Sequence, residues 1–365
     1  MRDEAYMREA FDLAERGRGL VSPNPLVGAL VVRDDEIVGR GWHEGPGKPH
    51  AEVLALREAR EGAHAGTLYT TLEPCDHYGR TPPCSLAIIE AGIARVVAAT
   101  RDPNPAVNGR GFERLRQAEV TVDEGIFVDE ASGQNEGFFK HVRTGLPFVT
   151  LKMAATLDGR VAARDGSSRW ISGEAARAEV QRMRGAADAI MVGAGTVLAD
   201  DPSLTVRDPA YRGSPVHRVI VDSQGRVPDS AHVLSDEAPT IVATTDLASR
   251  ERHEAWRRAG ADVVVYEPKD GRVPLVDLFG DLGKRDLQNV LLEGGPTLAW
   301  SGVADGCVDK IVLFLAPILI GGRDAPGILG GEGLAPIGEA VRLDVRSVGF
   351  VGADIKVEAY VHRDR

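Results

Sequence analysis

Two short segments that carry metal-binding side chains constrain this 365-residue chain more than any other feature. His50 and Glu52 lie in the first segment, and Cys75 and Cys84 lie in the second. One imidazole and two thiolates provide three zinc ligands and leave the fourth tetrahedral position open, which is typical of catalytic zinc sites. Glu52 follows His50 by two residues, so its carboxylate can lie beside the open position and carry a proton. The pattern predicts one zinc ion per chain, with Glu52 as the acid–base residue.

The spacing of the two cysteines is unusual. The order of ligands resembles that of the zinc-dependent nucleobase deaminases, in which His-x-Glu is followed by Pro-Cys-x-x-Cys. Here eight residues separate Cys75 from Cys84. This stretch contains Gly79, Pro82 and Pro83, and we expect it to loop out and return Cys84 to the metal.

Cys84 precedes the apolar run 86–89, which predicts that it lies in the first turn of a helix. The exposed N–H groups and the dipole at that position favour a thiolate. His77 lies between the cysteines and is an alternative ligand. A second alternative is that the histidine and the two cysteines are ordinary buried residues without metal.

The length of the chain predicts two domains, because 365 residues exceed the usual size of a single core. Segments typical of strands and helices alternate along both halves, which indicates an α/β protein. The polar stretch 141–147 contains Gly145 and Pro147 and is a candidate linker. We therefore predict a first domain over residues 1–145 and a second over residues 146–365.

Three local predictions concern the first half of the chain. We expect a helix from Tyr6 to Glu15 with Asp3 as its N-cap, and a hairpin that joins 29–33 to 36–40 through a turn at 34–35. We also expect a single helix from Val128 to Val142 that packs back on the first domain.

The composition excludes several classes of protein. The formal net charge of −11 argues against a nucleic-acid binder, which needs a basic surface. No apolar run approaches the length of a membrane span, and the charged start of the chain does not resemble a signal peptide. Three cysteines are too few for a disulfide framework. We expect a cytoplasmic protein that contacts neither membrane nor nucleic acid and forms a homo-oligomer.

Further motifs resemble the RibD family of bifunctional riboflavin biosynthesis enzymes, in which the long cysteine spacing is the norm. In the first half they are 23–28 (Pro-Asn-Pro-Leu-Val-Gly), 41–43 (Gly-Trp-His) and 50–52 (His-Ala-Glu). In the second half they are 155–162, 168–172, 192–202, 221–223 and 292–297. The resemblance covers nearly the whole chain. It implies a cytidine-deaminase-like three-layer domain followed by a domain similar to dihydrofolate reductase.

The resemblance also implies two consecutive reactions on a small phosphorylated pyrimidine. The first is hydrolytic deamination of 2,5-diamino-6-ribosylamino-4(3H)-pyrimidinone 5′-phosphate at zinc. The second is NADPH-dependent reduction of the ribosyl group of 5-amino-6-(5-phosphoribosylamino)uracil to ribityl. One alternative is a zinc nucleobase or nucleic-acid deaminase with a non-catalytic C-terminal binding domain, which the acidic charge disfavours. Another is a regulator with a structural zinc, which the intact Glu52 disfavours.

Specific residues follow from the same resemblance. Asn24 is expected to hydrogen-bond the pyrimidine, unless it only caps its own loop. Lys152 is expected either to assist hydride transfer or to form a structural salt bridge. The remaining substrate contacts are expected at Ser168, Arg184, Leu204, Arg207 and Glu293. The NADPH contacts are expected at Ala154, Trp170, Thr196, Asp200, Ser223 and Gly295.

Part of this set is independently reasonable on chemical grounds. Gly193 and Gly195 follow an apolar strand and lead into a helix, and Gly294 and Gly295 repeat the arrangement. Two such corners can hold the two ends of a dinucleotide, although either alone is equally typical of a tight structural turn. Leu198 occupies the third glycine position of a Rossmann fingerprint, so we do not predict that fold. Guanidinium groups suit phosphate because they bind it through two hydrogen bonds, although an arginine on an acidic protein is more often a surface charge.

Overall fold

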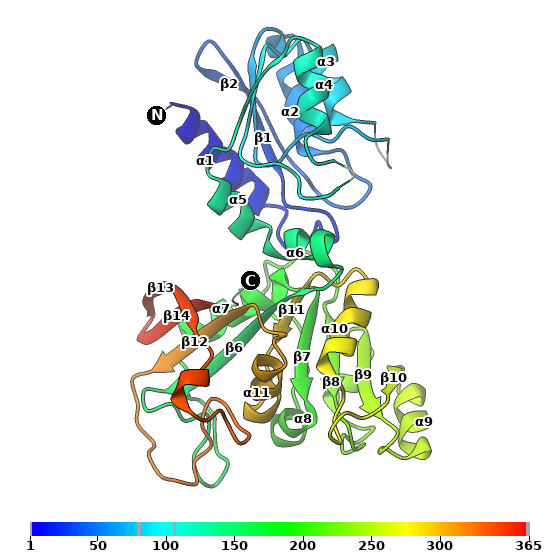
Figure 1. Ribbon diagram of the computed structural model, residues 1–365, viewed down its shortest axis with the longest axis vertical. Helices are drawn as coiled ribbons and strands as arrows, with labels where there is room; N and C mark the ends of the chain where they lie inside the picture. Colours follow the sequence, from blue (N-terminus) through cyan, green and yellow to red (C-terminus); the bar gives the residue numbers. More distant parts are fainter. Residues whose placement is uncertain (1, 79–81, 106, 363–365) are drawn as a thin grey trace. The chain divides into compact units, whose positions relative to one another are not determined.

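The computed structural model describes residues 2–78, 82–105 and 107–362 (Figure 1). The chain divides into two compact units, Met1–Gly145 (unit 1) and Leu146–Arg365 (unit 2). Each unit has its own sheet and its own buried core. Among the described residues, no helix combines the length and the apolar character needed to cross a membrane.

Unit 1 is a five-stranded mixed sheet with helices on both faces (Figure 1). The strand order is β2-β1-β3-β4-β5, in which β1 is antiparallel to β2 and β3 and the remaining pairs are parallel. Its elements are α1 (Arg2–Glu15), β1 (Gly28–Arg33), β2 (Glu36–Trp42), α2 (Ala51–Ala59), the short 3₁₀ helix η1 (Arg60–Ala63), β3 (Thr67–Thr70), α3 (Cys84–Glu90), β4 (Arg95–Ala98), α4 (Arg110–Gln117), β5 (Thr121–Glu124), α5 (Val128–Gln134) and α6 (Glu136–Thr144).

The alternation of side chains along the central strands produces two hydrophobic layers in unit 1. Leu30 and Val32 of β1 pack with α1 and α5, whereas Ala29 and Val31 pack with α2, α3 and α4. Gly41 lets α2 approach β2 closely, because a Cβ there would lie 2.1 Å from the carbonyl oxygen of Ala51. The start of α2 is therefore fixed against the sheet.

Two local predictions for unit 1 were wrong. Asp3 is not an N-cap but lies inside α1, where it pairs with Arg95 at 2.8 Å and accepts a hydrogen bond from Tyr69. The helix expected over 128–142 is interrupted at Asn135. The buried amide of Asn135 bonds both backbone groups of Leu26, accepting from its N–H at 2.7 Å and donating to its carbonyl at 2.9 Å. A residue that completes these distant hydrogen bonds favours a break between two short helices.

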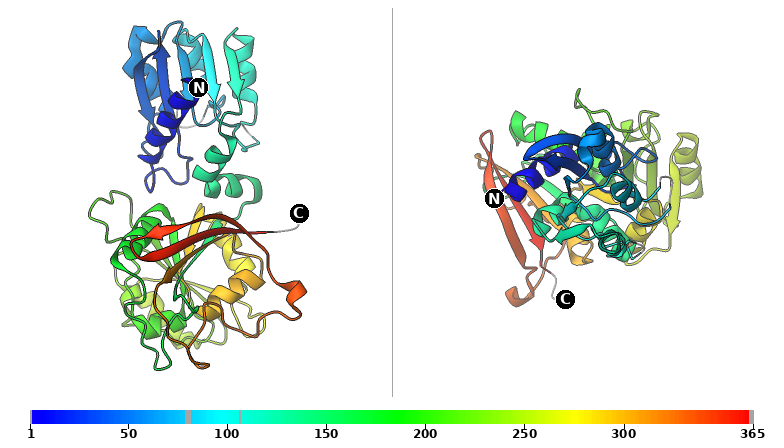
Figure 2. Two further views of the ribbon diagram at one scale, coloured as in Figure 1. Left: turned by 90° about the vertical axis from the view of Figure 1, so that its left-hand side faces the viewer. Right: turned by 90° about the horizontal axis from the view of Figure 1, so that it is seen from above.

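Unit 2 is built on a nine-stranded sheet of order β10-β9-β8-β7-β11-β6-β12-β14-β13. Neighbouring strands from β10 to β12 pair in parallel, whereas β14 pairs antiparallel with both β12 and β13 at one edge of the sheet (red in Figure 2). Its elements are β6 (Phe148–Thr156), α7 (Glu174–Ala186), β7 (Ala189–Gly193), α8 (Ala194–Asp200), β8 (His217–Val221), η2 (His232–Leu234), β9 (Thr240–Thr245), α9 (Arg250–Arg258), β10 (Asp262–Tyr266), α10 (Leu275–Lys284), β11 (Asn289–Leu292), α11 (Pro296–Ala304), β12 (Lys310–Ala316), η3 (Ile337–Glu339), β13 (Leu343–Val351) and β14 (Asp354–Val361).

Helices cover both faces of the parallel part of this sheet. α10 and α11 bury Phe279 and Ala299 against Leu151 and Met191 on one face. On the other face, α8 and α9 pack on Ile190 and its neighbours, and the buried Trp256 donates its indole N–H to the carbonyl of Val227 at 3.0 Å. The β7–α8 and β11–α11 connections therefore meet at the carboxyl edge of neighbouring strands, where ligands bind in open α/β sheets.

Candidate functional site

Unit 1 gathers the three predicted zinc ligands in one place. His50 is the N-cap residue of α2, Cys84 is the first residue of α3, and Cys75 lies in the loop after β3. Nδ1 of His50 lies 3.2 Å from Sγ of Cys84 and 3.5 Å from Sγ of Cys75. Ligand atoms bound tetrahedrally to zinc at about 2.0–2.3 Å are separated by about 3.5 Å, so both the donor types and their spacing fit zinc.

Other residues of the loop between the cysteines do not join this group. His77 is exposed, and among the described residues the cluster contains only the histidine and the two cysteines. Gly79, which we expected to help the loop return, lies outside the described residues. Cys84 donates its backbone N–H to Sγ of Cys75 at 3.4 Å, so the start of α3 stabilises the neighbouring thiolate.

The pKa values of the titratable side chains in this cluster are strongly shifted. Hydrogen bonds from Cys84 and, after the opposing effect of burial, from His50 lower the pKa of Cys75 to about 4. The pKa of Cys84 is raised by its hydrogen bond to Cys75 and by burial. Glu52 is 3% exposed, and burial raises the pKa of its carboxyl to about 7, partly offset by His50. A carboxyl that neither fully holds nor fully releases its proton near neutrality suits acid–base catalysis.

Asn24 is connected to this cluster through His43. Nδ2 of Asn24 lies 2.9 Å from Nε2 of His43, whose Nδ1 lies 3.3 Å from the carbonyl oxygen of Pro49. The ring of His43 packs edge-on against that of His50, with 5.5 Å between centroids. Burial lowers the pKa of His43, which keeps the ring neutral and lets Nε2 accept from the Asn24 amide. Sequence reasoning gave His43 no role, although it lies in the Gly-Trp-His motif.

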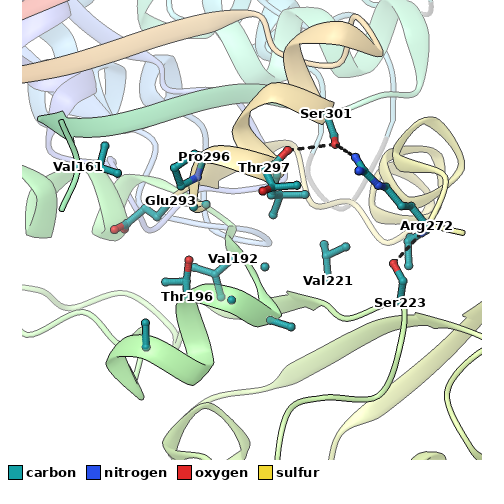
Figure 3. Close-up of a pocket in the computed structure, with 18 of the residues that line it drawn as sticks. Val161, Val192, Thr196, Val221, Ser223, Arg272, Glu293, Pro296, Thr297 and Ser301 are labelled. Carbon is teal, nitrogen blue, oxygen red and sulfur yellow. Dashed lines mark hydrogen bonds between the residues drawn. The ribbon is translucent and has the colours of Figure 1, made fainter. Parts of the chain in front are cut away.

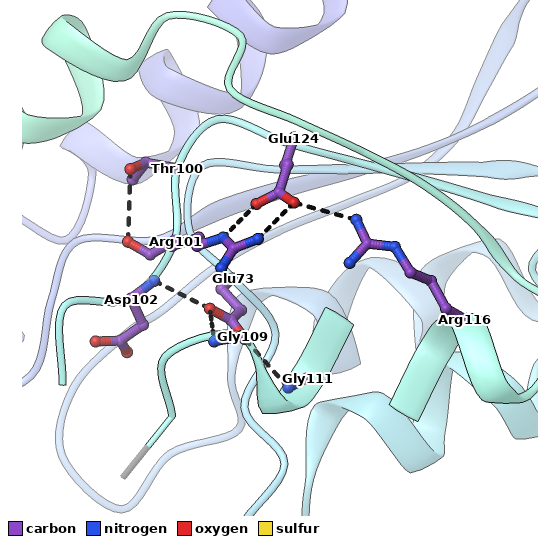
Figure 4. Close-up of polar contacts among 8 residues, drawn as sticks. All are labelled: Glu73, Thr100, Arg101, Asp102, Gly109, Gly111, Arg116 and Glu124. Carbon is purple, nitrogen blue, oxygen red and sulfur yellow. Dashed lines mark hydrogen bonds and ion pairs between the residues drawn. The ribbon is translucent and has the colours of Figure 1, made fainter. Parts of the chain in front are cut away.

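Glu73, two residues before Cys75, is a second residue that sequence reasoning missed. Its buried carboxylate accepts backbone N–H groups from Asp102 at 3.3 Å, Gly109 at 2.9 Å and Gly111 at 3.1 Å (Figure 4). Gly111 allows this contact, because a Cβ there would lie 1.9 Å from the carbonyl oxygen of Pro74. The chain segment that leads into Cys75 is thereby held against the start of α4.

Asp76 holds the other side of Cys75. Oδ1 of Asp76 accepts a hydrogen bond from the Ser85 hydroxyl at 2.5 Å, and the same oxygen forms an ion pair with Nε of Arg114, also at 2.5 Å. The Asp76 carboxylate therefore connects the ligand loop to α3 and α4. Such supporting hydrogen bonds orient metal ligands in other proteins.

The first prediction concerns this support. Glu73→Gln replaces one accepting oxygen with an N–H₂ group that faces a backbone N–H, so we expect unit 1 to lose about 1–3 kcal/mol of stability. Zinc should bind about 10–100-fold more weakly, because the Cys75 loop is less well oriented. Chelator competition and thermal unfolding measure the two effects. Glu90→Gln, an exposed change on the helix that carries Cys84, is the control, and equal behaviour of the two variants would contradict a supporting role for Glu73.

Unit 2 contains a large cavity at the carboxyl edge of its sheet. Its volume is about 1130 Å³, more than a single drug-sized ligand requires. Ten of the residues predicted to bind substrate or NADPH, or to act in hydride transfer, line it: Lys152, Ala154, Ser168, Arg184, Thr196, Asp200, Leu204, Ser223, Glu293 and Gly295. Trp170 and Arg207 are not among the lining residues.

The two remaining residues lie on the surface. Trp170 is 70% exposed, and its ring stacks under the guanidinium of Arg177 at 4.7 Å. Arg207 is exposed, and its backbone N–H donates to Oε1 of Gln181 at 2.7 Å. Of the two arginines proposed for the substrate phosphate, the structure therefore places only Arg184 at the cavity.

A buried charge network marks one end of the cavity. Glu293 accepts two hydrogen bonds from Arg184, at 2.6 and 3.0 Å, and lies 3.6 Å from Nζ of Lys152. Burial would raise the pKa of Glu293, but the two cations outweigh it and the pKa is lowered. The carboxylate is therefore ionised, and it holds both cations beside the cavity wall.

The two ends of the cavity differ chemically. Figure 3 shows Glu293 and Val161 at one end and Ser223 and Arg272 at the other, with Val192 between them. The glycine corner before α11 and the start of α8 both supply lining residues, and they lie close together, because a Cβ on Gly295 would lie 3.3 Å from Oγ1 of Thr196.

Comparison with known proteins assigns both units to families. Residues 1–100 match the cytidine and deoxycytidylate deaminase zinc-binding region, and residues 147–357 match the RibD C-terminal domain. The chain is 43% identical to riboflavin biosynthesis protein RibD of Escherichia coli, over 97% of this chain and 98% of that protein. It is 44% identical to RibD of Actinobacillus pleuropneumoniae, over 99% and 96% of the two chains.

Solved structures show the same similarity over the full length. Acinetobacter baumannii RibD superposes with a TM-score of 0.88 at 37% identity, and the match covers 99% of each chain. A diaminohydroxyphosphoribosylaminopyrimidine deaminase/5-amino-6-(5-phosphoribosylamino)uracil reductase from Thermotoga maritima gives a TM-score of 0.88 at 35% identity, again over 99% of each chain.

Proposed function

The chain belongs to the RibD family of bifunctional deaminase–reductases of riboflavin biosynthesis, and on that premise we propose which of its residues carry each reaction. Unit 1 deaminates the diaminopyrimidinone phosphate, and unit 2 reduces the ribosyl group of the product with NADPH. The observation that carries this division is that the ligand trio with Glu52 lies wholly in unit 1, whereas the cavity lies wholly in unit 2.

In unit 1, His50, Cys75 and Cys84 hold zinc, which when bound acts as a Lewis acid toward water. Glu52 takes a proton from that water and delivers it to the amine that leaves the ring. Its burial beside Cys84 keeps the carboxyl close to the pKa that this exchange needs. Asn24 orients the pyrimidine. Its amide is itself held in place, because Nδ2 of Asn24 is hydrogen-bonded to Nε2 of His43.

In unit 2, the residues at the carboxyl edge of the sheet surround the cofactor and the sugar phosphate. NADPH, when bound, supplies the hydride for C1′ of the ribosyl group. Lys152 stabilises or protonates the sugar end of the substrate, and Glu293 keeps its ammonium group oriented. Arg184 binds the substrate phosphate. Its Nε and Nη2 also donate hydrogen bonds to Glu293, which keeps the guanidinium oriented.

A two-stage assay tests the division of labour. Protein treated with a strong zinc chelator is expected to stop releasing ammonia from the diamino substrate and to keep oxidising NADPH with the deaminated one. Loss of both activities on chelation, in protein that remains folded, would contradict the assignment of the reactions to separate sites.

The second prediction concerns Lys152. Lys152→Met removes the cation and leaves Glu293 paired with Arg184, so we expect kcat of the reductase to fall about 10–100-fold, the worth of a hydrogen bond to a charged group. NADPH affinity should change little. The matched control is Lys356→Met, which breaks a lysine–carboxylate pair with Glu179 outside the cavity. A loss of stability without a loss of kcat, as expected for the control, would show that Lys152 is only a structural partner.

The wider setting of the enzyme follows from the same premise. Its partners are small phosphorylated pyrimidines, and the net charge of −11 argues against general binding to nucleic acid. The expectation of a cytoplasmic homo-oligomer stays a prediction, which sedimentation of the purified protein and fractionation of cells test directly.

A further inference from the structure

The end of the unit 2 cavity that lies away from Glu293 is rich in cationic side chains. Arg226, Lys269 and Arg272 line it, and we call these three residues the basic end of the cavity. Two carboxylates, Asp270 and Asp305, line the cavity as well. The predicted cofactor contact Ser223 also lies here, whereas Arg226, Lys269 and Arg272 belong to none of the family motifs and have no assigned role.

The basic end is held together by hydrogen bonds between two loops. The carboxylate of Asp222 accepts the backbone N–H groups of Val227 at 2.7 Å and Gln224 at 3.3 Å, which shapes the turn that carries Arg226. Oγ of Ser223 then accepts the N–H of Val273 at 3.0 Å. The turn after β8 and the 269–273 loop are thus joined at the cavity wall.

Arg272 is oriented but keeps most of its hydrogen-bonding capacity. Its Nη1 donates to Oγ of Ser301 at 3.3 Å, and that hydroxyl donates in turn to the carbonyl of Thr297 at 3.1 Å (Figure 3). Within residues 2–78, 82–105 and 107–362, neither Arg272 nor Lys269 forms an ion pair with a carboxylate. A guanidinium has five N–H donors in a planar fork, so Arg272 can still bind a planar or tetrahedral anion through two of them.

The direction of the bound cofactor follows from the positions of the two ends. If the ribosyl group is reduced beside Lys152 and Glu293, as proposed above, the nicotinamide would lie there and the adenosine half of NADPH would extend toward the opposite end. NADPH differs from NADH by a single phosphate on the 2′ oxygen of that adenosine. Enzymes that prefer NADH place a carboxylate on the 2′ hydroxyl. Here Asp222, the carboxylate at the end of β8, is buried and already bonded to its own turn.

We propose that Arg272, assisted by Arg226 and Lys269, binds the 2′-phosphate of NADPH and gives the reductase its preference over NADH. This inference rests on the proposed function of the cavity and adds the residues that select the cofactor. Arg272 is the central residue, because its hydrogen bond to Ser301 holds it at the cavity wall. Arg226 contributes less, because its Nε lies 4.0 Å from the carboxylate of Asp222 and is partly neutralised by it.

Binding experiments on the full-length, zinc-loaded protein test the proposal without relying on turnover. Calorimetric titration with adenosine 2′,5′-bisphosphate and with AMP separates the contribution of the 2′-phosphate from that of the adenosine. We expect Arg272→Gln to weaken the bisphosphate about 10–100-fold and to leave AMP unchanged. KM for NADPH should rise by a similar factor while KM for NADH stays the same. Arg250→Gln, an arginine whose side chain is 92% exposed outside the cavity, is the control.

A blocking variant separates failure of this proposal from failure of the cavity assignment. Gly195 lines the cavity, and a Cβ there would meet no atom within 4 Å, so Gly195→Trp fills the space without straining the backbone. If Gly195→Trp abolishes NADPH binding but Arg272→Gln leaves the ratio of NADPH to NADH affinity intact, Arg272 does not read the 2′-phosphate. If Arg272→Gln weakens the binding of NADPH and NADH equally, Arg272 contacts a part of the cofactor that both dinucleotides share, and the proposal also fails. If Gly195→Trp binds NADPH normally, the cavity is not the cofactor site.

Discussion

Cys75→Ser is expected to lose its zinc and, with it, deamination. A neutral hydroxyl is a poor zinc ligand, whereas the Cys75 thiol is already held as a thiolate by Cys84 and His50. Zinc binds to structural sites with about 10–16 kcal/mol, so removing one of three protein ligands should weaken binding by about 10³-fold. Deamination should become undetectable at ordinary zinc concentrations.

Metal analysis and ammonia release measure this outcome, and NADPH oxidation with the deaminated substrate shows whether unit 2 is intact. Cys307→Ser is the matched control, because Cys307 is the remaining cysteine and belongs to the core of unit 2. We expect the control to keep its zinc and both activities. A Cys75→Ser protein with full zinc occupancy and a normal deaminase rate would show that another residue completes the site.

Local sequence chemistry predicted those parts of the fold that depend on neighbouring residues. The hairpin of β1 and β2 turns at Asp34 and Asp35, both with positive φ, as a type I′ turn requires. The alternating α/β pattern is confirmed in both units. Each of these features follows from the type and order of residues within a short window.

Features that depend on distant partners were not predictable in this way. The break at Asn135 makes sense only because Leu26, 109 positions away, presents two backbone groups to its amide. Asp3 is a residue type that commonly caps helices, but here its carboxylate forms an ion pair with Arg95 of β4 instead. A propensity describes what a residue does in isolation, whereas these two side chains are committed to tertiary contacts.

The same distinction applies to the two sites. Metal ligands are visible in a sequence because few side chains can bind zinc, so their type alone limits the choice. Glu73 gave no such signal, since its partners are backbone N–H groups that any residue offers. Arg184 and Arg207 looked equivalent as phosphate ligands, and only their burial distinguishes them. Residue type indicates what a side chain can do, and the fold decides which candidates are in position.

Glu52→Gln is expected to stop deamination while leaving reduction intact. Glutamine has nearly the volume of glutamate and does not change the three ligands, so the variant should fold and retain zinc. It cannot accept a proton, however, and an acid–base residue typically contributes about 10²–10⁴-fold to the rate. Because Glu52 is 3% exposed and glutamine fills the same space, the variant should keep an unchanged structure.

The measurement compares two substrates in one preparation. With the diamino substrate, ammonia release should fall by that factor, and with the deaminated substrate, NADPH consumption should stay close to the wild-type rate. Glu58→Gln is the control, because Glu58 lies on the same helix but is exposed, bonded to the backbone of Arg40. The residues assigned to deamination belong to unit 1, and those assigned to reduction belong to unit 2. A reductase rate that falls in parallel with deamination, in folded and zinc-loaded Glu52→Gln protein, would contradict two independent active sites.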